Sequence, residues 1–400
     1  MHRFMLSVCA WCACSMTFNL CAADVEKVDI FEAGQDGYAL YRIPGIVATK
    51  QGTLLAYCEA RRTGKSDWDM IDILLRRSVD GGRTWDAARK ISDVPGTKTK
   101  NPVALAQALA GVDDVTYNNP LAIVDDKGTV HLLFCLEYMR CFIIQSHDDG
   151  QSWSAAREIT PAFNAYRPDY AWQVLATGPG HGIQLSSGRL LVPIWLSLGT
   201  GGHAHRPSVI STIYSDDAGQ TWQAGEIAVP NNETIINPSE SAVVQLSDGR
   251  VMLNARTESR PNRRVVTISS DGTNDWSAPE FVEDLPEPIC MASLIRAKAH
   301  DSSQNRLIFC NPNNLEKAVG DPQPGKGRDR KNLSLRISDD EGRSWSAGKT
   351  LEPGFSGYSD LAVLSDGTVI CFYERGSVDS KSSTKTGRLT IARIAPEWLE

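Results

Sequence analysis

The stretch SVDGGRTW at residues 78–85 places serine, aspartate, glycine and tryptophan at fixed spacings. Its central Asp and Gly are turn residues, because Asp can accept hydrogen bonds from the backbone ahead and Gly adopts a positive φ without steric cost. The pattern returns as SHDDGQSW at 146–153, SDDAGQTW at 215–222, SSDGTNDW at 269–276 and SDDEGRSW at 338–345. A period above 50 residues indicates a repeat architecture, and this decides the fold.

Each octet follows an apolar run, such as IDILLRRS at 71–78. The octets are therefore expected to be hairpin tips, with each Trp folded back onto its sheet. We interpret their Asp residues as structural and not as catalytic groups.

A second repeated pattern consists of an apolar strand, a polar turn and another apolar strand, and it occurs six times. Each of the first five copies is followed by an octet. We predict an all-β fold, a β-propeller of six four-stranded antiparallel blades, because radial repetition leaves few exposed sheet edges. The strand-like segments 25–33 and 388–394 are expected to complete one blade together and so close the ring. The turns are marked by Gly52, Gly128, Gly188, Gly249, Asn305 and Gly367.

The first 23 residues have a basic tip, an apolar stretch and a small-residue end at Ala22 and Ala23. This pattern is typical of a secretory signal peptide, so we expect a secreted or periplasmic protein whose residues 24–400 form a single propeller domain. A lipoprotein anchor at Cys21 is disfavoured, because Leu20 stands where a small residue is usual. No other stretch is long and apolar enough to span a bilayer.

Six cysteines follow the predicted signal peptide. Those in apolar strands are expected to be free buried thiols, whereas Cys135 and Cys141 could pair across a hairpin, which the sequence leaves open. No spacing indicates a metal site, so we expect neither a metal nor a cofactor, and we interpret His203 and His205 as part of a glycine-rich surface loop. The net charge of −7 without a basic cluster argues against nucleic acid as a partner.

Three arginines stand at the edges of strand patterns in different blades. Arg42 lies in YRIP beside the first hairpin, Arg256 ends the fourth, and Arg330 precedes a strand assigned to the sixth blade. Each alone could form a surface ion pair, but together they could converge on an anionic substrate.

Taken together, these stretches resemble the exo-α-sialidases of glycoside hydrolase family 33, over essentially the whole mature chain. The resemblance implies an enzyme that removes terminal α-linked sialic acid from sialylated glycans, glycoproteins or glycolipids, with retention, through a tyrosyl-enzyme intermediate. The matching stretches, besides YRIP and the octets, are EAR at 59–61, TGPGHGIQL at 177–185, NPSES at 237–241, LNAR at 253–256, GYSDL at 357–361 and YERG at 373–376.

The same resemblance implies roles for the catalytic residues. Tyr358 resembles the nucleophile, Glu240 its partnering base and Asp67 the acid/base. Because Asp69 stands where the family often has Gly, Asp69 is the second candidate for the acid and Asp72 the third.

The substrate-binding roles follow in the same way. Arg42, Arg256 and Arg330 resemble the triad that grips the substrate carboxylate, and Glu374 resembles the acid that orients Arg42. Arg61, which follows Glu59, resembles an arginine facing the sugar, with an ion pair within the first blade as the alternative. Tyr170 and Trp172 are expected either to line the acyl or glycerol pocket or simply to pack, and His181 to lie in a tight turn near the mouth.

The chemistry suits these residue types. Sialic acid carries a carboxylate on its anomeric carbon, so an attacking carboxylate would meet a like charge at roughly 4 Å, about 4 kcal/mol at an effective dielectric near 20. A neutral phenol avoids that repulsion. Guanidinium groups bind a carboxylate through two hydrogen bonds and stay charged.

Other functions remain open on the sequence alone. The chain could be a trans-sialidase or a hydrolase for a related nonulosonic acid, since the acyl-pocket residues cannot be placed from spacing. A non-catalytic glycan-binding propeller would be marked by loss of the Tyr, Glu or Asp, and all three are present.

Overall fold

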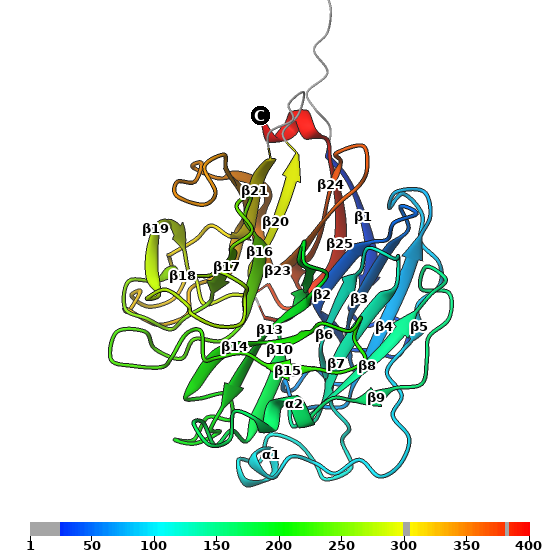
Figure 1. Ribbon diagram of the computed structural model, residues 1–400, viewed down its shortest axis with the longest axis vertical. Coiled ribbons are helices and arrows are strands. Elements are labelled where there is room, and N and C mark those ends of the chain that lie inside the picture. Colours follow the sequence, from blue (N-terminus) through cyan, green and yellow to red (C-terminus); the bar gives the residue numbers. More distant parts are fainter. Residues whose placement is uncertain (1–24, 299–304, 381–383) are drawn as a thin grey trace, which may run out of the picture.

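The computed structural model describes residues 25–298, 305–380 and 384–400. The regular secondary structure of the described residues is almost entirely antiparallel β-sheet, as the sequence predicts (Figure 1). The predicted signal peptide, residues 1–23, lies outside the described residues. The three short helices are α1 (Pro102–Ala106), α2 (Pro161–Asn164) and η1 (Pro396–Leu399).

The first two sheets contain the first two hairpins. One is β2 (Leu40–Ala48), β3 (Leu54–Arg61), β4 (Ile71–Ser78) and β5 (Arg89–Lys90). The other is β6 (Tyr117–Val124), β7 (Val130–Leu136), β8 (Arg140–Ser146) and β9 (Arg157–Glu158), to which β11 (Gly180–His181) adds in parallel beside β6.

The next two sheets repeat this order. One is β10 (Val174–Thr177), β13 (Leu190–Ser197), β14 (Ser208–Ser215) and β15 (Gln223–Ala224), with β12 (Ile183–Gln184) also on β13. The other is β16 (Ser241–Gln245), β17 (Val251–Ala255), β18 (Arg263–Ser269) and β19 (Glu280–Pro286).

The last sheet has seven strands and divides at β23 (Lys349–Val363). Residues 349–355 of β23 pair with β22, and residues 356–363 pair with β24. The sheet is therefore two four-stranded groups that share one long strand. Its other strands are β20 (Ser293–Lys298), β21 (Asn305–Pro312), β22 (Lys331–Ser338), β24 (Val369–Ser377), β25 (Thr386–Ile394) and β1 (Val25–Glu32).

The two ends of the chain share a sheet, as predicted. Strand β1 pairs antiparallel with β25 from Val25 opposite Ile394 to Glu32 opposite Arg388. One assignment needs correction, because Arg330 precedes β22 and so belongs to the fifth group counted from β2 and not to the sixth.

Neighbouring groups meet through their first strands. Strand β2 contacts β6 and β23, β12 contacts β6 and β16, and β20 contacts β16 and β23, so these contacts run in a closed cycle. In Figure 1, β2, β16 and β23 lie near the middle, while β5 and β19 lie at opposite edges. The apolar core fills the spaces between sheets, as where Leu55 of β3 packs in one cluster with Phe134 of β7.

The octets are turns held by their own side chains. Each begins at the last residue of the third strand of its group. In the second copy, Ser146 Oγ accepts a hydrogen bond from Gly150 N at 2.8 Å and donates one to Asp148, which accepts from both N and Oγ of Ser152. Trp153 packs against the core cluster between the first two groups. The structural interpretation of the octets is confirmed.

Candidate active site

One polar cavity, of about 390 Å³, collects most of the side chains singled out in the sequence. We call it the arginine cavity. The cavity lies at the end of the sheets where the first strand of each group begins. The second strand of each group ends there too, because the two strands are antiparallel. Its lining includes Arg42, Arg61, Asp67, Asn119, Tyr138, Trp195, His203, His205, Arg206, Asn237, Ser239, Glu240, Arg256, Glu258, Arg330 and Tyr358.

Irregular strand pairing directs three of these side chains inward. The pairing register shifts between Arg42 and Gly45 in β2, between Asn118 and Leu121 in β6, and between Ser356 and Ser359 in β23. Extra residues in a strand re-aim side chains and are frequent beside functional sites. At two of these places a non-glycine residue has a positive φ: Ile43 at 57° and Asn119 at 50°.

Tyr358 on β23 is only 4% exposed, and its hydroxyl faces Glu240. The hydroxyl donates to Glu240 Oε1 at 2.5 Å and accepts from Arg256 Nη1 at 2.9 Å. Burial and the Glu240 carboxylate raise the pKa of the Tyr358 phenol well above its ordinary value, although nearby arginines oppose this. The phenol is therefore neutral in the free site, and Glu240 is placed to accept its proton.

The arginines surround the same ring. The guanidinium carbons of Arg42 and Arg330 lie 5.1 and 5.0 Å from the Tyr358 ring centroid, and Arg256 also forms an ion pair with Glu240. Three cations meeting at one phenol make the cavity suited to an anion.

Glu374 on β24 fixes Arg42. Its Oε1 accepts from Arg42 Nε at 2.9 Å, and its Oε2 accepts from Tyr358 N at 3.1 Å. This buried carboxylate thus ties the arginine to the backbone of the tyrosine. Gly357 is needed here, because a Cβ at that position would lie 2.3 Å from Glu374 Oε2.

Two of the arginines keep unused hydrogen-bonding capacity. Arg256 Nε is buried with no partner among the described residues. No salt bridge among the described residues involves Arg330, which donates to the carbonyl of Ile289 at 2.8 Å. A buried donor without an acceptor lowers the stability of the folded protein. A bound carboxylate would supply the missing acceptors.

Asp67 reaches the cavity from the loop between β3 and β4, and its side chain is 46% exposed. Its Oδ1 accepts from Arg61 Nη1 at 2.7 Å and lies 3.8 Å from Arg42 Nη1. Burial acts to raise the pKa of this carboxyl, but Arg61 and Arg42 outweigh it and hold the pKa below its usual range. Asp67 is therefore ionised in the free site.

The other two acids considered for this role point elsewhere. Asp69 accepts hydrogen bonds from Thr63 Oγ1 and Met70 N within its own loop. Asp72 accepts from the Tyr38 hydroxyl at 2.8 Å and pairs with Lys90 at 2.6 Å. Neither lines the arginine cavity, which leaves Asp67 as the acid in position.

The structure does not bring Tyr170 and Trp172 to the cavity. Trp172 is 2% exposed in a core cluster, and its Nε1 donates to Phe163 O at 2.8 Å. The Tyr170 hydroxyl donates to Pro207 O. These aromatics pack, which was the alternative to a pocket role.

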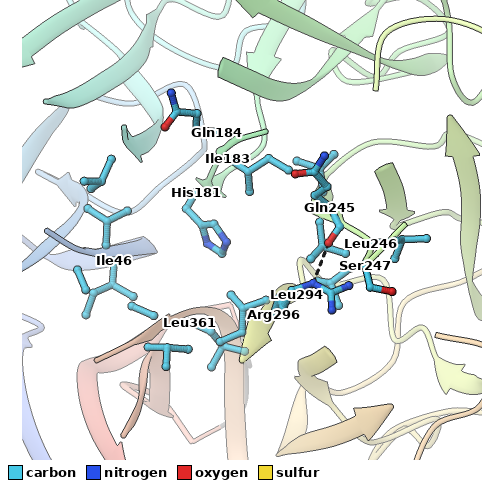
Figure 2. Close-up of a pocket in the computed structure, with 18 residues that line it drawn as sticks. Ile46, His181, Ile183, Gln184, Gln245, Leu246, Ser247, Leu294, Arg296 and Leu361 are labelled. Carbon is cyan, nitrogen blue, oxygen red and sulfur yellow. Dashed lines mark hydrogen bonds between the residues drawn. The ribbon is translucent and has the colours of Figure 1, made fainter. Parts of the chain in front are cut away.

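His181 does not line the arginine cavity either, because it lies at the opposite end of the sheets. It lines a separate cavity of about 450 Å³ formed where first strands end, with apolar walls that include Ile46, Leu294 and Leu361 (Figure 2). Its Nδ1 lies 2.7 Å from Asp360 Oδ1. Burial acts to lower the pKa of His181, but Asp360 outweighs it and raises the pKa.

Sequence reasoning missed an aromatic wall of the arginine cavity. The ring of His205 lies 5.5, 5.0 and 5.2 Å from the rings of Trp68, Tyr138 and Trp195. Burial lowers the pKa of His205 to about 4, so this side chain is neutral near pH 7. His203 and His205 do lie in a glycine-rich loop, between β13 and β14, but both side chains line the arginine cavity, which the sequence analysis did not predict.

The remaining sequence expectations concern cysteines, metals and membranes. Cys135 and Cys141 lie opposite each other on β7 and β8, and both are buried free thiols. Within the described ranges, no group of three or more His, Cys, Asp or Glu side chains could hold a metal ion. None of the helices in the described part of the chain is both long and apolar enough to cross a membrane.

Comparison with known proteins gives the family. Residues 52–371 match the model of the BNR repeat-like domain, which is most of the chain. The chain belongs to the BNR repeat-like domain family. The matched range contains all five octets.

Several proteins named sialidase are similar to this chain. A sialidase of Micromonospora viridifaciens is 31% identical over 87% of this chain, and one of Bacteroides fragilis is 32% identical over 87%. The chain spans 52% and 62% of the length of these two relatives. The solved structure of the Hadza microbial sialidase Hz136 superposes with a TM-score of 0.71 at 26% identity, covering 93% of this chain and 69% of that one.

Proposed function

We propose that this protein is a retaining exo-α-sialidase, which hydrolyses terminal α-linked sialic acid from glycoconjugates. The observation that carries the proposal is the Tyr358–Glu240 hydrogen bond of 2.5 Å, enclosed by three arginines in one cavity. Relatives named sialidase support the substrate class.

The substrate carboxylate binds first in this account. It is held by Arg42, Arg256 and Arg330, whose planar guanidinium groups match a carboxylate. This places the anomeric carbon, which bears that carboxylate, over the Tyr358 hydroxyl. An oxygen nucleophile without charge meets no repulsion there, unlike an aspartate or glutamate.

In the first step the Tyr358 oxygen bonds to the anomeric carbon, and the bond from that carbon to the leaving oxygen breaks. Glu240 takes the phenol proton, and Asp67 donates a proton to the leaving oxygen. In the second step a water oxygen bonds to the anomeric carbon and the bond from that carbon to the Tyr358 oxygen breaks; Asp67 takes a proton from the water, and the released Tyr358 oxygen recovers its proton from Glu240. Two displacements on one carbon give net retention.

Asp67 must be protonated for the first step, yet it is ionised in the free site. A carboxylate bound to Arg42 cancels part of the charge that holds the Asp67 pKa down and adds a like charge nearby. Substrate binding therefore favours the protonated acid that the reaction needs.

The proposal extends to the whole chain. The sheets are taken as six blades of one propeller over residues 24–400, supported by the closed cycle of first-strand contacts and by the β1–β25 pairing. Residues 1–23 act as a signal for export to the periplasm or outside the cell, supported by their composition alone.

The test is hydrolysis of 3′-sialyllactose followed by ¹H NMR from the first minutes of reaction. We expect free sialic acid to appear first as the α anomer and then to mutarotate. With excess lactose-based acceptor present, water should remain the main acceptor. An initial β anomer would contradict retention, predominant transfer would indicate a trans-sialidase, and binding without turnover would indicate a glycan-binding propeller.

A further inference from the structure

Glu59 lies behind the arginine cavity and has no role in the mechanism above. It sits on β3, its side chain is fully buried, and it does not line the cavity. A buried carboxylate is costly unless it is paired and fully hydrogen-bonded. The contacts of Glu59 show where that cost is offset.

Both carboxylate oxygens are used as acceptors. Oε2 accepts from Arg61 Nη2 at 2.7 Å and from Arg61 Nε at 3.1 Å. Oε1 accepts from the backbone N of Asn119 at 2.9 Å. Glu59 therefore holds one side chain on its own strand and one backbone position on β6, in the neighbouring sheet.

The remaining nitrogen of Arg61 continues the chain of contacts. Its Nη1 donates to Asp67 Oδ1 at 2.7 Å, so a single guanidinium joins the buried Glu59 to the exposed Asp67. Asp67 belongs to a loop, and its other contact with a cation is longer: Oδ1 lies 3.8 Å from Arg42 Nη1. Arg61 is thus its closest fixed cation.

We propose that Glu59 is a positioning residue that acts on Asp67 through Arg61. Its carboxylate fixes the direction of the guanidinium and offsets its positive charge, so that Asp67 is held in place without being locked in the ionised form. This rests on the proposed function, because only an acid/base Asp67 needs to exchange its proton in each cycle.

Other charged and titratable groups that face Glu59, Arg61 and Asp67 also affect the pKa of Asp67. Asp67 faces Arg42 of β2, Arg61 of β3 and the neutral His205 from the loop after β13. Burial raises the pKa of Glu59, although the charge of Arg61 and the hydrogen bond from Asn119 N oppose this; the Tyr138 phenol that it also faces stays neutral because burial raises its pKa. Among these groups, Glu59 alone adds negative charge beside Arg61 apart from Asp67 itself.

The test compares the pH dependence of kcat on 3′-sialyllactose, whose sugar leaving group needs an acid, and on an aryl sialoside, whose phenol does not. In Glu59→Gln the charge of Arg61 is no longer offset, so Asp67 should lose its proton at lower pH. We expect the alkaline limb on sialyllactose to move down by about one pH unit, with the aryl profile unmoved. Arg61→Gln removes the cation and should move the same limb upward.

The control is Glu352→Gln, which weakens a partly buried ion pair with Lys27 and the contacts of the same carboxylate with Arg375 and the Tyr373 hydroxyl, outside the arginine cavity. It should lower the melting temperature without moving either limb. If Glu59→Gln does not fold, the Arg61→Gln variant provides the test. An alkaline limb on sialyllactose that stays in place or moves to lower pH in Arg61→Gln contradicts the proposal.

Failure of this inference differs from failure of the proposed function. Wild-type protein that does not hydrolyse sialosides overturns both. Wild-type turnover with limbs that stay fixed in Glu59→Gln, or that move equally on both substrates, overturns the role of Glu59 alone.

Discussion

At the scale of single residues, Arg330 offers the clearest test of the carboxylate grip. It is the triad member with no salt bridge among the described residues, so its hydrogen-bonding capacity is free for substrate. Arg330→Lys keeps the charge but loses the two-pronged hydrogen bond. We expect kcat/KM to fall by about 2 kcal/mol or more, roughly 30-fold. Kinetics close to wild type would remove Arg330 from the triad.

Asp67 and Tyr358 can be separated by leaving group. Asp67→Ala should lose far more kcat/KM on sialyllactose than on an aryl sialoside, because a phenol leaves without protonation. Tyr358→Phe should be slow on both, since both need the new bond to the anomeric carbon. Equal losses on the two substrates for Asp67→Ala would refute its role as the acid.

How far the sequence predicts this site depends on the residue. The three arginines stand at the edges of strand patterns in different blades, which indicated that they could converge, and the resemblance to family 33 sialidases indicated Asp67 and Tyr358; all five line the arginine cavity. The sequence left open whether Tyr170 packs and did not predict that His205 lines the cavity, since which aromatic residues pack and which line a cavity depends on contacts between sheets. Such contacts leave no periodic signal in the chain.

At the scale of elements, the octet turns should respond to acid. In the third octet Asp217 accepts from Thr221 N and Oγ1. Burial acts to raise its pKa, but these hydrogen bonds outweigh it and lower the pKa to about 2. Because the pKa of Asp217 is lower in the folded than in the unfolded protein, its ionised carboxylate stabilises the fold. This contribution to the free energy of unfolding is present above about pH 4 and is lost as the pH falls towards 2.

Melting temperatures of wild type and Asp217→Asn, measured from pH 6 to pH 2.5, check this. The variant should melt lower at pH 6, and the difference should shrink as pH falls. A difference that is independent of pH would show that the carboxylate charge does not stabilise the turn. Activity at pH 6 should be unaffected, since the octets lie outside the arginine cavity.

The irregular part of β23 should be intolerant of a single methyl group. In Gly357→Ala the new Cβ would press on Glu374, which holds Arg42 and Tyr358 N. We expect a loss of stability of about 1–3 kcal/mol and a raised KM. The matched control is Gly387→Ala on β25, where a Cβ meets only ordinary contacts from 3.5 Å. Equal effects of the two substitutions would contradict this explanation.

The sequence predicted which strands form but not how they deviate. Alternating apolar residues and glycine turns locate β2 and β23 well. The register shifts at Arg42 and Ser356 arise from packing against neighbouring strands, so no local pattern announces them. Those shifts are what direct Arg42 and Tyr358 into the cavity.

At the scale of the whole molecule, the pairing of strand β1 with β25 holds the first and last strands of the chain together. A protein beginning at Ala33 lacks the strand that covers β25 and leaves the edge of β25 unpaired. We expect a lower melting temperature and concentration-dependent association, compared with a chain beginning at Asp24. Unchanged melting would show that the β1–β25 pairing is not needed to hold the sheets together.

The central claim is that Tyr358 forms a covalent bond with the sugar. A fluorinated sialosyl fluoride tests it most directly, because its good leaving group allows the first step while the ring fluorine slows the second. After brief reaction and proteolysis, peptide mass spectrometry should find the sugar on Tyr358, with no adduct in Tyr358→Phe. An adduct on Glu240 or Asp67, or none at all with wild-type turnover intact, would contradict the account.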